Sequence, residues 1–277
     1  MIRIIASDLD GTLLLNGKQE LPEELFPVIR RLKDMGILFV AASGRQLSNM
    51  RRMFEPVKDD IAYICENGAA ALYQGRVLYE DAFDPALVED VIRTAWKKEN
   101  TEMSISCLNH YYLRPKTEAY LAMMRDEVRC DYKLLGDTCH VPESCMKMAV
   151  YEKDGADAHL RFWQEHFGDR CKVVTSGPAW IDFVPFGTSK GKGIKRIMDI
   201  LGIQPEEGAA FGDEYNDIEL IESVYYGFAM ETAKPGVKEK AHFTVQREEE
   251  ILEKLIAYKG DMGEVLKACM NIVKKVY

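Results

Sequence analysis

The first 75 residues alternate short, uniformly apolar runs with stretches of helical spacing. Three apolar runs are too short for surface helices and predict buried strands, at residues 2–7, 37–42 and 61–65. Between the first two, residues 22–35 repeat apolar side chains at helical spacing and stop at Gly36, which predicts a helix. Pro27 should distort the first turn of that helix, because it lacks a backbone donor. Strands that alternate with helices predict a parallel sheet with right-handed crossovers.

The pattern changes after Gln74-Gly75, which predicts the turn of a β-hairpin. Further strands are expected at residues 103–108, 111–114, 146–151, 172–175 and 180–184, and helices at 85–98, 117–128 and 156–167. Hairpin-like strands mixed with helices are typical of an α+β unit. We therefore expect a separate α+β domain over residues 82–184.

The parallel pattern resumes after Pro185. A helix is expected from Ser189 to about Gly202, then a strand at 209–212, a helix at 216–222, a strand at 226–230 and two charged amphipathic helices over 247–276. The predicted fold class is α/β. Residues 1–81 and 185–277 form a Rossmann-like parallel-sheet core with helices on both faces, and residues 82–184 are inserted into it.

Composition limits the class of protein. The 277 residues are 47% hydrophobic and 29% charged, as in an ordinary globular chain. With a net charge of −9, the protein lacks the excess of basic residues that is typical of nucleic-acid-binding proteins. No apolar run reaches the length of a membrane span or a signal peptide, and the seven cysteines are odd in number and irregularly spaced. We expect reduced thiols, a cytoplasmic location, and no membrane or nucleic-acid partner.

Two carboxylates follow the first predicted strand, in Asp8-Leu9-Asp10-Gly11-Thr12. Aspartates two positions apart can turn toward one small volume, and the glycine permits a tight turn behind them. Such oxygen ligands suit a hard cation such as Mg²⁺. Taken alone, the pattern is equally typical of a solvated acidic turn.

Three further segments are expected at the same edge of the sheet, at residues 43–45, 189–191 and 212–217. In Ser43-Gly44-Arg45, a hydroxyl and a glycine backbone at a helix start can bind phosphate oxygens. Lys190 lies in the first turn of a helix, where its charge opposes the helix dipole, and residues 212–217 add more carboxylates. Alone, residues 43–45 are equally typical of an N-cap, Lys190 of a solvated basic residue, and residues 212–217 of a turn before a helix cap. Together, at one edge of the sheet, the segments favour a functional site over these ordinary interpretations.

In this order, and with Glu66-Asn67-Gly68-Ala69 before the inserted domain, the segments resemble those of the haloacid dehalogenase-like hydrolases. More narrowly, they are similar to the Cof-type phosphatases, in which an α/β cap is inserted into the core. The resemblance covers essentially the whole chain. It implies a Mg²⁺-dependent phosphatase that hydrolyses small phosphorylated metabolites, such as sugar phosphates or phosphorylated cofactors, through an aspartyl-phosphate intermediate.

The resemblance also implies residue roles. Asp8 would be the nucleophile, and Asp10 the general acid and then the base. The Asp8 side chain, the Asp10 backbone carbonyl and the Asp213 carboxylate would hold Mg²⁺. The phosphoryl oxygens would be bound by Ser43, Gly44, Lys190 and Asn216.

Asp217 would support the metal or Lys190 from outside the first ligand sphere. Glu214 departs from the family pattern, because the position after Gly212-Asp213 is usually small or neutral; it adds an acid near the metal. The inserted cap would select the substrate. Arg45, Arg114 and residues 180–182 could face the cleft, but each is more typical of a surface or packing residue.

Two other functions stay open. A phosphoryl transferase or mutase on the same fold would share the nucleophile and the acid. A non-catalytic protein that binds Mg²⁺ and phosphate for regulation is disfavoured by the intact Asp8 and Lys190, since loss of the nucleophile would be its expected mark. The sequence indicates no oligomeric state and no particular substrate.

Overall fold

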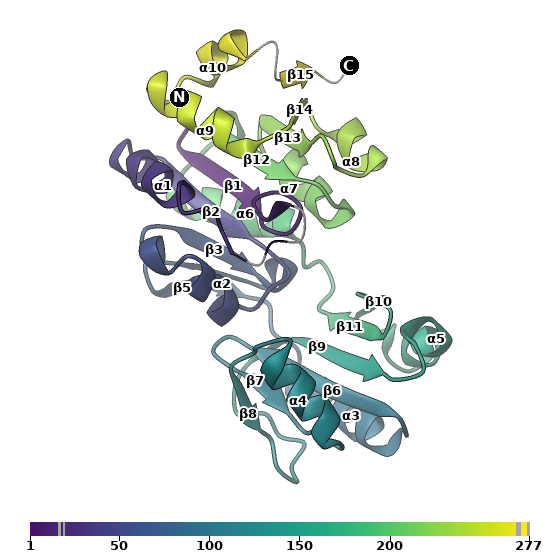
Figure 1. Ribbon diagram of the computed structural model, residues 1–277. Helices are drawn as coiled ribbons and strands as arrows, with labels where there is room; N and C mark the ends of the chain where they lie inside the picture. The colour runs from purple at the N-terminus through teal and green to yellow at the C-terminus, as the bar shows by residue number, and fades with distance from the viewer. Residues whose placement is uncertain (16–17, 19, 270–272, 276–277) are drawn as a thin grey trace. The chain divides into compact units, whose positions relative to one another are not determined.

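The computed structural model describes residues 1–15, 18, 20–269 and 273–275. The chain forms two compact units, which we describe separately (Figure 1). The first comprises Met1–Arg45, Met50–Tyr79 and Ser189–Tyr277, and the second comprises Gln46–Asn49 and Glu80–Thr188. The assignment of residues 1–81 and 185–277 as a catalytic core, and of residues 82–184 as a cap that selects the substrate, stays a prediction.

The first unit is built on a nine-stranded sheet, as far as the described residues show, in the order β15-β14-β13-β12-β1-β2-β3-β4-β5. The strands from β14 to β3 run parallel, whereas β4 and β15 pair antiparallel with β3 and β14. The strand bounds are β1 Ile4–Asp8, β2 Leu38–Ala42, β3 Ala62–Cys65, β4 Ala70–Tyr73, β5 Arg76–Glu80, β12 Gly208–Gly212, β13 Tyr226–Met230, β14 Phe243–Val245 and β15 Val273–Lys275.

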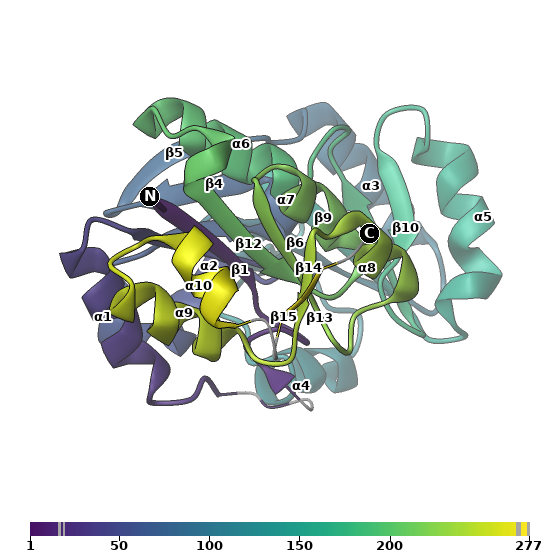
Figure 2. The same cartoon turned by 90° about the horizontal axis from the view of Figure 1, so that it is seen from above.

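Helices cover both faces of this sheet (Figure 2). On one face, Ile4 and Ala6 of β1 pack in one apolar cluster with Ile194 and Ile197 of α6. On the other face lie α1 and α9, which contact each other. The helix bounds are α1 Leu25–Asp34, α2 Leu47–Met53, α6 Lys190–Leu201, α7 Ile218–Glu222, α8 Pro235–Lys240, α9 Glu248–Ala257 and α10 Met262–Ala268. Strands buried on both faces explain why the sequence shows uniform apolar runs here, and the predicted α/β fold class is confirmed.

Two expectations differ from the structure. Pro27 lies in the first turn of α1, where backbone N–H groups have no partner within the helix, so it causes no loss of a hydrogen bond. The expected helical run over 247–276 is wrong at its end: after α10 the chain forms β15, which pairs with β14. Pairing with an open sheet edge outweighs local helical spacing there. Residues 270–272 and 276 lie outside the described residues.

The second unit has a six-stranded sheet in the order β10-β11-β9-β6-β7-β8, in which only the described β7–β8 pair is parallel. Its strands are β6 Thr101–Cys107, β7 Tyr111–Leu113, β8 Tyr132–Leu134, β9 Cys145–Glu152, β10 Lys172–Thr175 and β11 Trp180–Val184. Its helices are α3 Pro85–Lys97, α4 Glu118–Asp126 and α5 Ala156–Phe167.

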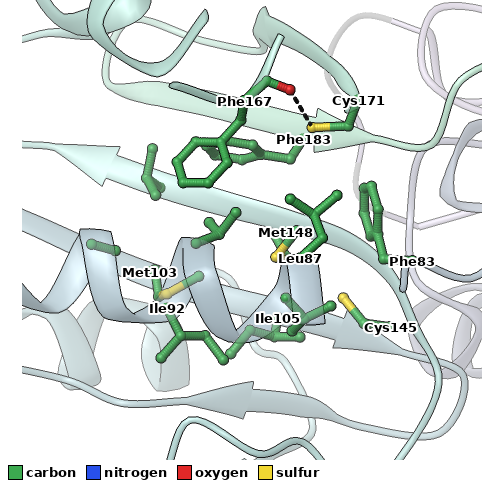
Figure 3. Packing of buried hydrophobic residues seen from close by; sticks show 14 of the residues in the cluster. Phe83, Leu87, Ile92, Met103, Ile105, Cys145, Met148, Phe167, Cys171 and Phe183 are labelled. Carbon is green, nitrogen blue, oxygen red and sulfur yellow. Dashed lines mark hydrogen bonds between the residues drawn. The ribbon is translucent and has the colours of Figure 1, made fainter. Parts of the chain in front are cut away.

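Apolar clusters hold the helices of the second unit against its sheet. Side chains of α3 and α5 pack on one face, with Phe183 of β11 among them (Figure 3). Tyr120 and Met124 of α4 pack with Leu113 in a separate, smaller cluster. Two helices and most of the buried aromatic side chains therefore share one face.

Two chain-wide features complete the description. No helix in the described ranges combines the length and the apolar character needed to cross a membrane. All seven cysteines lie in the described part of the chain, and no disulfide bond joins any of them.

Phe183 provides a test of the packing in the second unit. Its ring is fully buried, with centroids 5.4 Å from Trp163 and 5.9 Å from Phe167. Phe183→Ala should lower the free energy of unfolding by about 3–5 kcal/mol, measured by urea unfolding. Phe186→Ala is the control: this ring is 58% exposed, and the change should stay within about 0.5 kcal/mol. Equal effects of the two substitutions would contradict the packing described here.

Candidate active site

The predicted site residues of the first unit start from neighbouring strand ends. Asp8 is the last residue of β1, Ser43 follows β2, and Asp213 follows β12. β1 lies between β2 and β12, and all three run parallel. Their carboxyl ends therefore meet at one edge of the sheet, where open α/β sheets form ligand sites.

Lys190 connects two of the predicted carboxylates. It is the first residue of α6, and its side chain is only 2% exposed. Its ammonium nitrogen Nζ lies 2.5 Å from Asp8 Oδ1 and 2.6 Å from Asp217 Oδ1. Burial lowers the pKa of Lys190, but the two carboxylates outweigh burial and raise it above its ordinary value. An ammonium group has three hydrogens, so one remains for a further acceptor.

Asp217 connects Lys190 to the loop after β12 through hydrogen bonds that both of its carboxylate oxygens accept. Its Oδ2 atom accepts hydrogen bonds from the backbone N–H groups of Asp213 and Glu214, both at 3.0 Å. A Cβ atom on Gly212 would lie 2.4 Å from the Asp217 Cβ, so only glycine fits at that position. Both carboxylate oxygens of Asp217 are thus engaged, which suits the predicted supporting role better than direct metal ligation.

Asp213 is held by the loop that follows β1. The hydroxyl of Thr12 donates to Asp213 Oδ1 at 3.3 Å. Gly11 has a φ of +97°, and a Cβ atom there would lie 2.1 Å from Asp213 Oδ2. The glycine that the sequence offered as a turn residue therefore also allows this close approach.

One oxygen each from Asp8, Asp213 and Asp217 lie within 4.8 Å of one another, close enough to hold a metal ion. Burial raises the pKa of Asp8 to about 8, while Lys190 lowers it and Asp217 raises it. Burial, Asp217 and Glu214 raise the pKa of Asp213 to about 6. Three carboxylates face one ammonium, so a divalent cation would relieve the excess negative charge. The all-oxygen donor set fits a hard cation.

Asp10 is paired with Arg45, which the sequence analysis favoured as a surface or packing residue. Arg45 binds Asp10 through two hydrogen bonds, from Nη2 to Oδ1 at 2.6 Å and from Nε to Oδ2 at 2.9 Å. The side chain of Asp10 is 54% exposed. The hydrogen bond to Asp10 raises the pKa of Arg45. This pair orients the carboxylate that the family resemblance implies as the general acid.

Arg114 and residues 180–182 belong to the second unit and make packing contacts there. The guanidinium of Arg114 lies 4.0 Å from the ring centroid of Trp96. Trp180 packs against Tyr151, with ring centroids 5.1 Å apart. These contacts agree with the packing roles that the sequence favoured.

Asn67, which belongs to the Glu66-Asn67-Gly68-Ala69 motif and had no predicted role, lies among the predicted phosphate ligands. The Asn216 side-chain amide donates to Asn67 Oδ1 at 3.0 Å, and a Cβ atom on Gly44 would lie 3.0 Å from the Asn67 amide. Ser43 is buried, and its hydroxyl oxygen accepts the backbone N–H of Arg45 at 3.2 Å. Ser43, Gly44 and Asn216 are thus brought together through Asn67.

Glu248 is a buried acid near Asp8 that no sequence pattern indicated. It is the first residue of α9, fully buried, and its Oε2 lies 2.5 Å from the hydroxyl oxygen of Ser7, the residue before Asp8. Burial raises its pKa well above the usual range. Three consecutive glutamates at the start of an amphipathic helix gave no sign that the first points inward. Glu214, the acid that departs from the family pattern, has its Oε1 atom 3.6 Å from Lys234 Nζ.

Comparison with known proteins defines the family. Residues 5–253 match the family of haloacid dehalogenase-like hydrolases. Because this match spans most of the chain, the protein belongs to that family. The predicted family is confirmed, and with it the prediction of an enzyme.

Two relatives and one solved structure show how far the similarity extends. The chain is 26% identical to the 5-amino-6-(5-phospho-D-ribitylamino)uracil phosphatase YbjI of Escherichia coli K12, over 87% of this chain and 90% of the relative. It is 29% identical to an HMP-PP phosphatase of Citrobacter koseri, over 88% and 90%. A haloacid dehalogenase-like hydrolase from Bacteroides thetaiotaomicron has the same fold, with a TM-score of 0.81, 20% identity, and coverage of 92% of this chain and 100% of that one.

The charge balance at Asp213 gives a prediction about pH. Since its pKa in the folded protein, about 6, exceeds the reference value of 3.8, ionisation of Asp213 opposes folding. Without metal, the wild-type protein should therefore be more stable at low pH, where Asp213 is protonated. It should lose part of its free energy of unfolding as the pH rises from about 4 to about 6. The Asp213→Asn variant has no carboxyl group here and should not lose this free energy. The difference in free energy of unfolding between the variant and the wild type should therefore grow over that pH range and then level off.

Urea unfolding in a chelator, at several pH values, measures this difference. An excess of divalent cation should then stabilise the wild type but not Asp213→Asn. Asp34→Asn, at an exposed position of α1, is the control. A constant stability difference across pH, or equal stabilisation by the cation, would contradict the proposed charge balance.

Proposed function

We propose that this protein is a Mg²⁺-dependent phosphatase that transfers a phosphoryl group to Asp8 and then to water. Membership of the hydrolase family, and relatives named as phosphatases, confirm the predicted class: a phosphatase for small phosphorylated metabolites. The metal, the covalent intermediate and the residue roles are our proposal. The observation that carries it is the buried contact of Lys190 with Asp8 at the end of β1.

Asp8 is the proposed nucleophile. One of its carboxylate oxygens, Oδ1, is held by Lys190, which leaves Oδ2 for attack on phosphorus. Burial alone favours the protonated carboxyl, so the reactive ionised form depends on the positive charge of Lys190 and of the bound cation. Attack forms an oxygen–phosphorus bond to Asp8 and breaks the bond to the leaving oxygen, which splits one difficult hydrolysis into two displacements.

Asp10 is the proposed proton carrier. In the first displacement its carboxyl group gives a proton to the leaving oxygen. In the second, the resulting carboxylate takes a proton from the water that attacks phosphorus, and Asp8 is released. Both carboxylate oxygens of Asp10 bond Arg45, which aligns the group and must yield at least one oxygen when the proton moves.

Mg²⁺ fits the carboxylate cluster. The Asp8 and Asp213 side chains and the Asp10 backbone carbonyl would hold it, while Asp217 keeps the loop and Lys190 in place. When bound, the ion offsets the negative charge of the nucleophile and of the phosphate, which otherwise repel each other. Asp8, Asp10 and Asp213 carry oxygen atoms only as possible ligands, which is the donor type that Mg²⁺ prefers.

The phosphoryl oxygens are the proposed partners of Ser43, Gly44, Lys190 and Asn216. Lys190 has one hydrogen to spare beyond its two carboxylate contacts, and Asn216 has one beyond its contact with Asn67. These donors are fixed before the substrate arrives, so little reorganisation accompanies charge movement in the transition state.

The substrate is a small phosphorylated metabolite, and the second unit is the proposed selector. The compounds in the names of the two relatives, 5-amino-6-(5-phospho-D-ribitylamino)uracil and HMP-PP, belong in the first substrate panel. A cytoplasmic location and the lack of nucleic-acid and membrane partners remain predictions from the sequence.

Asp8→Asn tests the nucleophile. The substitution keeps the size of the side chain but removes the attacking oxyanion, so release of inorganic phosphate from an aryl phosphate should fall by about a thousandfold or more. Asp34→Asn should retain full activity. Chelation with EDTA should stop wild-type turnover, and added Mg²⁺ should restore it. Full activity of Asp8→Asn, or in EDTA, would contradict the proposal.

Product analysis on the best metabolite separates the remaining alternatives. Free phosphate as the sole product supports hydrolysis. Transfer of the phosphoryl group to a second sugar would identify a transferase or mutase, and binding without turnover would identify a regulatory protein.

A further inference from the structure

The loop between β3 and β4 has an unusual backbone. Glu66, Asn67 and Gly68 have φ angles of 50°, 56° and 100°, all in the left-handed region. This region is unfavourable for residues other than glycine, and Asn tolerates it better than most. Such conformations persist only where surrounding contacts fix them.

Contacts with two of the predicted site segments fix this loop. The backbone N–H of Glu66 donates to the carbonyl of Arg45 at 3.1 Å, and that of Asn67 donates to the carbonyl of Ser43 at 3.0 Å. On its other side, a Cβ atom on Gly68 would lie 2.0 Å from the carbonyl oxygen of Ser189, the N-cap of α6. The loop therefore fills the space between the turn after β2 and the start of the helix that carries Lys190.

The Asn67 side chain reaches the third segment. Its Oδ1 atom accepts the hydrogen bond from Asn216 Nδ2 at 3.0 Å. The nearest atoms to a Cβ placed on Gly44 are also those of the Asn67 amide, at 3.0 Å. Asn67 thus lies between two residues that we assign to the phosphoryl oxygens.

The direction of this hydrogen bond matters for anion binding. An asparagine amide presents two N–H donors on one side and an acceptor oxygen on the other. Because Asn67 Oδ1 takes one N–H of Asn216, the amide of Asn216 is fixed with its nitrogen at this position. The second N–H is then left for a phosphoryl oxygen, whereas a reversed amide would present an oxygen that repels the anion.

We propose that Asn67 is a positioning residue of the phosphate subsite, and that it fixes the Asn216 amide so that an N–H group faces the phosphoryl oxygens. This inference rests on the proposed function. It assigns Asn67 no contact with the reacting atoms. Asn67 lies beside both Gly44 and Asn216, and the inference places its effect on Asn216, to which it is hydrogen-bonded.

Asn67→Gly is the appropriate substitution, because glycine accepts the left-handed backbone and only the side chain is lost. The Kd for inorganic phosphate, measured by calorimetry on the full chain with Mg²⁺, should rise about 3- to 10-fold, as for loss of one hydrogen bond. Asn100→Gly is the matched control: Asn100 also has a φ of 56°, but its amide contacts Asp154 in the second unit. Phosphate affinity should not change there.

A double-mutant cycle tests the route of the effect. If Asn67 acts through Asn216, the variant with both Asn67→Gly and Asn216→Ala should bind phosphate no more weakly than Asn216→Ala alone. Thermal unfolding should show that Asn67→Gly and Asn100→Gly fold alike. Unchanged affinity in Asn67→Gly, or losses that multiply in the double variant, would overturn the inference.

Turnover of an aryl phosphate separates this inference from the proposed function. Suppose that the wild type binds phosphate and the double-mutant cycle gives the expected result, but no ester is hydrolysed. The positioning role of Asn67 would then stand, and the proposed phosphatase activity would be contradicted. If the wild type hydrolyses the ester but Asn67→Gly leaves the phosphate affinity unchanged, the phosphatase proposal stands and the positioning role of Asn67 is contradicted. No phosphate binding by the wild type would overturn the inference.

Discussion

A buried ammonium group between two aspartates is the interaction on which the rest of the site depends. Lys190 is almost inaccessible to solvent and lies within hydrogen-bonding distance of both Asp8 and Asp217. A buried charge of this kind is costly unless it is paired. The pairing therefore constrains three elements at once: the end of β1, the start of α6 and the loop after β12. Breaking it would leave uncompensated charge at each of them.

The carboxylates around Lys190 also decide how this acidic site would bind an anion. The negative charge of Asp8, Asp213 and Asp217 exceeds the positive charge of Lys190. Burial, together with repulsion from neighbouring carboxylates, raises the pKa values of Asp8 and Asp213. A divalent cation would remove this repulsion and convert the cluster from a barrier to phosphate into a binding site. Asp217, with both oxygens engaged, holds the geometry while Asp8 and Asp213 remain for the ion.

Local signals predicted the sheet and the acidic residues at its edge. Runs such as 37–42 are buried on both faces, so their composition alone identifies strands. Asp8 is the last residue of one such strand, and Ser43 directly follows another. Gln74 and Gly75 both have positive φ, as the predicted hairpin turn requires. Pro27 was misjudged because its effect depends on where the helix begins.

Pairs distant in sequence could not be predicted in this way. The partners Asn67 and Asn216 are 149 residues apart, and Asp10 and Arg45 are 35 apart. Each is a polar residue outside the strands and α-helices, with no periodicity to reveal what it faces. The strand β15 escaped prediction for a related reason, since the open edge of β14 decides its conformation.

Covalent labelling tests the central claim, transfer of a phosphoryl group to Asp8, most directly. The Asp10→Asn variant should accept phosphate from an aryl phosphate, whose good leaving group needs no acid, but it lacks the base for the second displacement. After an acid quench, mass spectrometry of the digested protein should therefore find phosphate on Asp8. Absence of bound phosphate, or its location on another residue, would contradict the account.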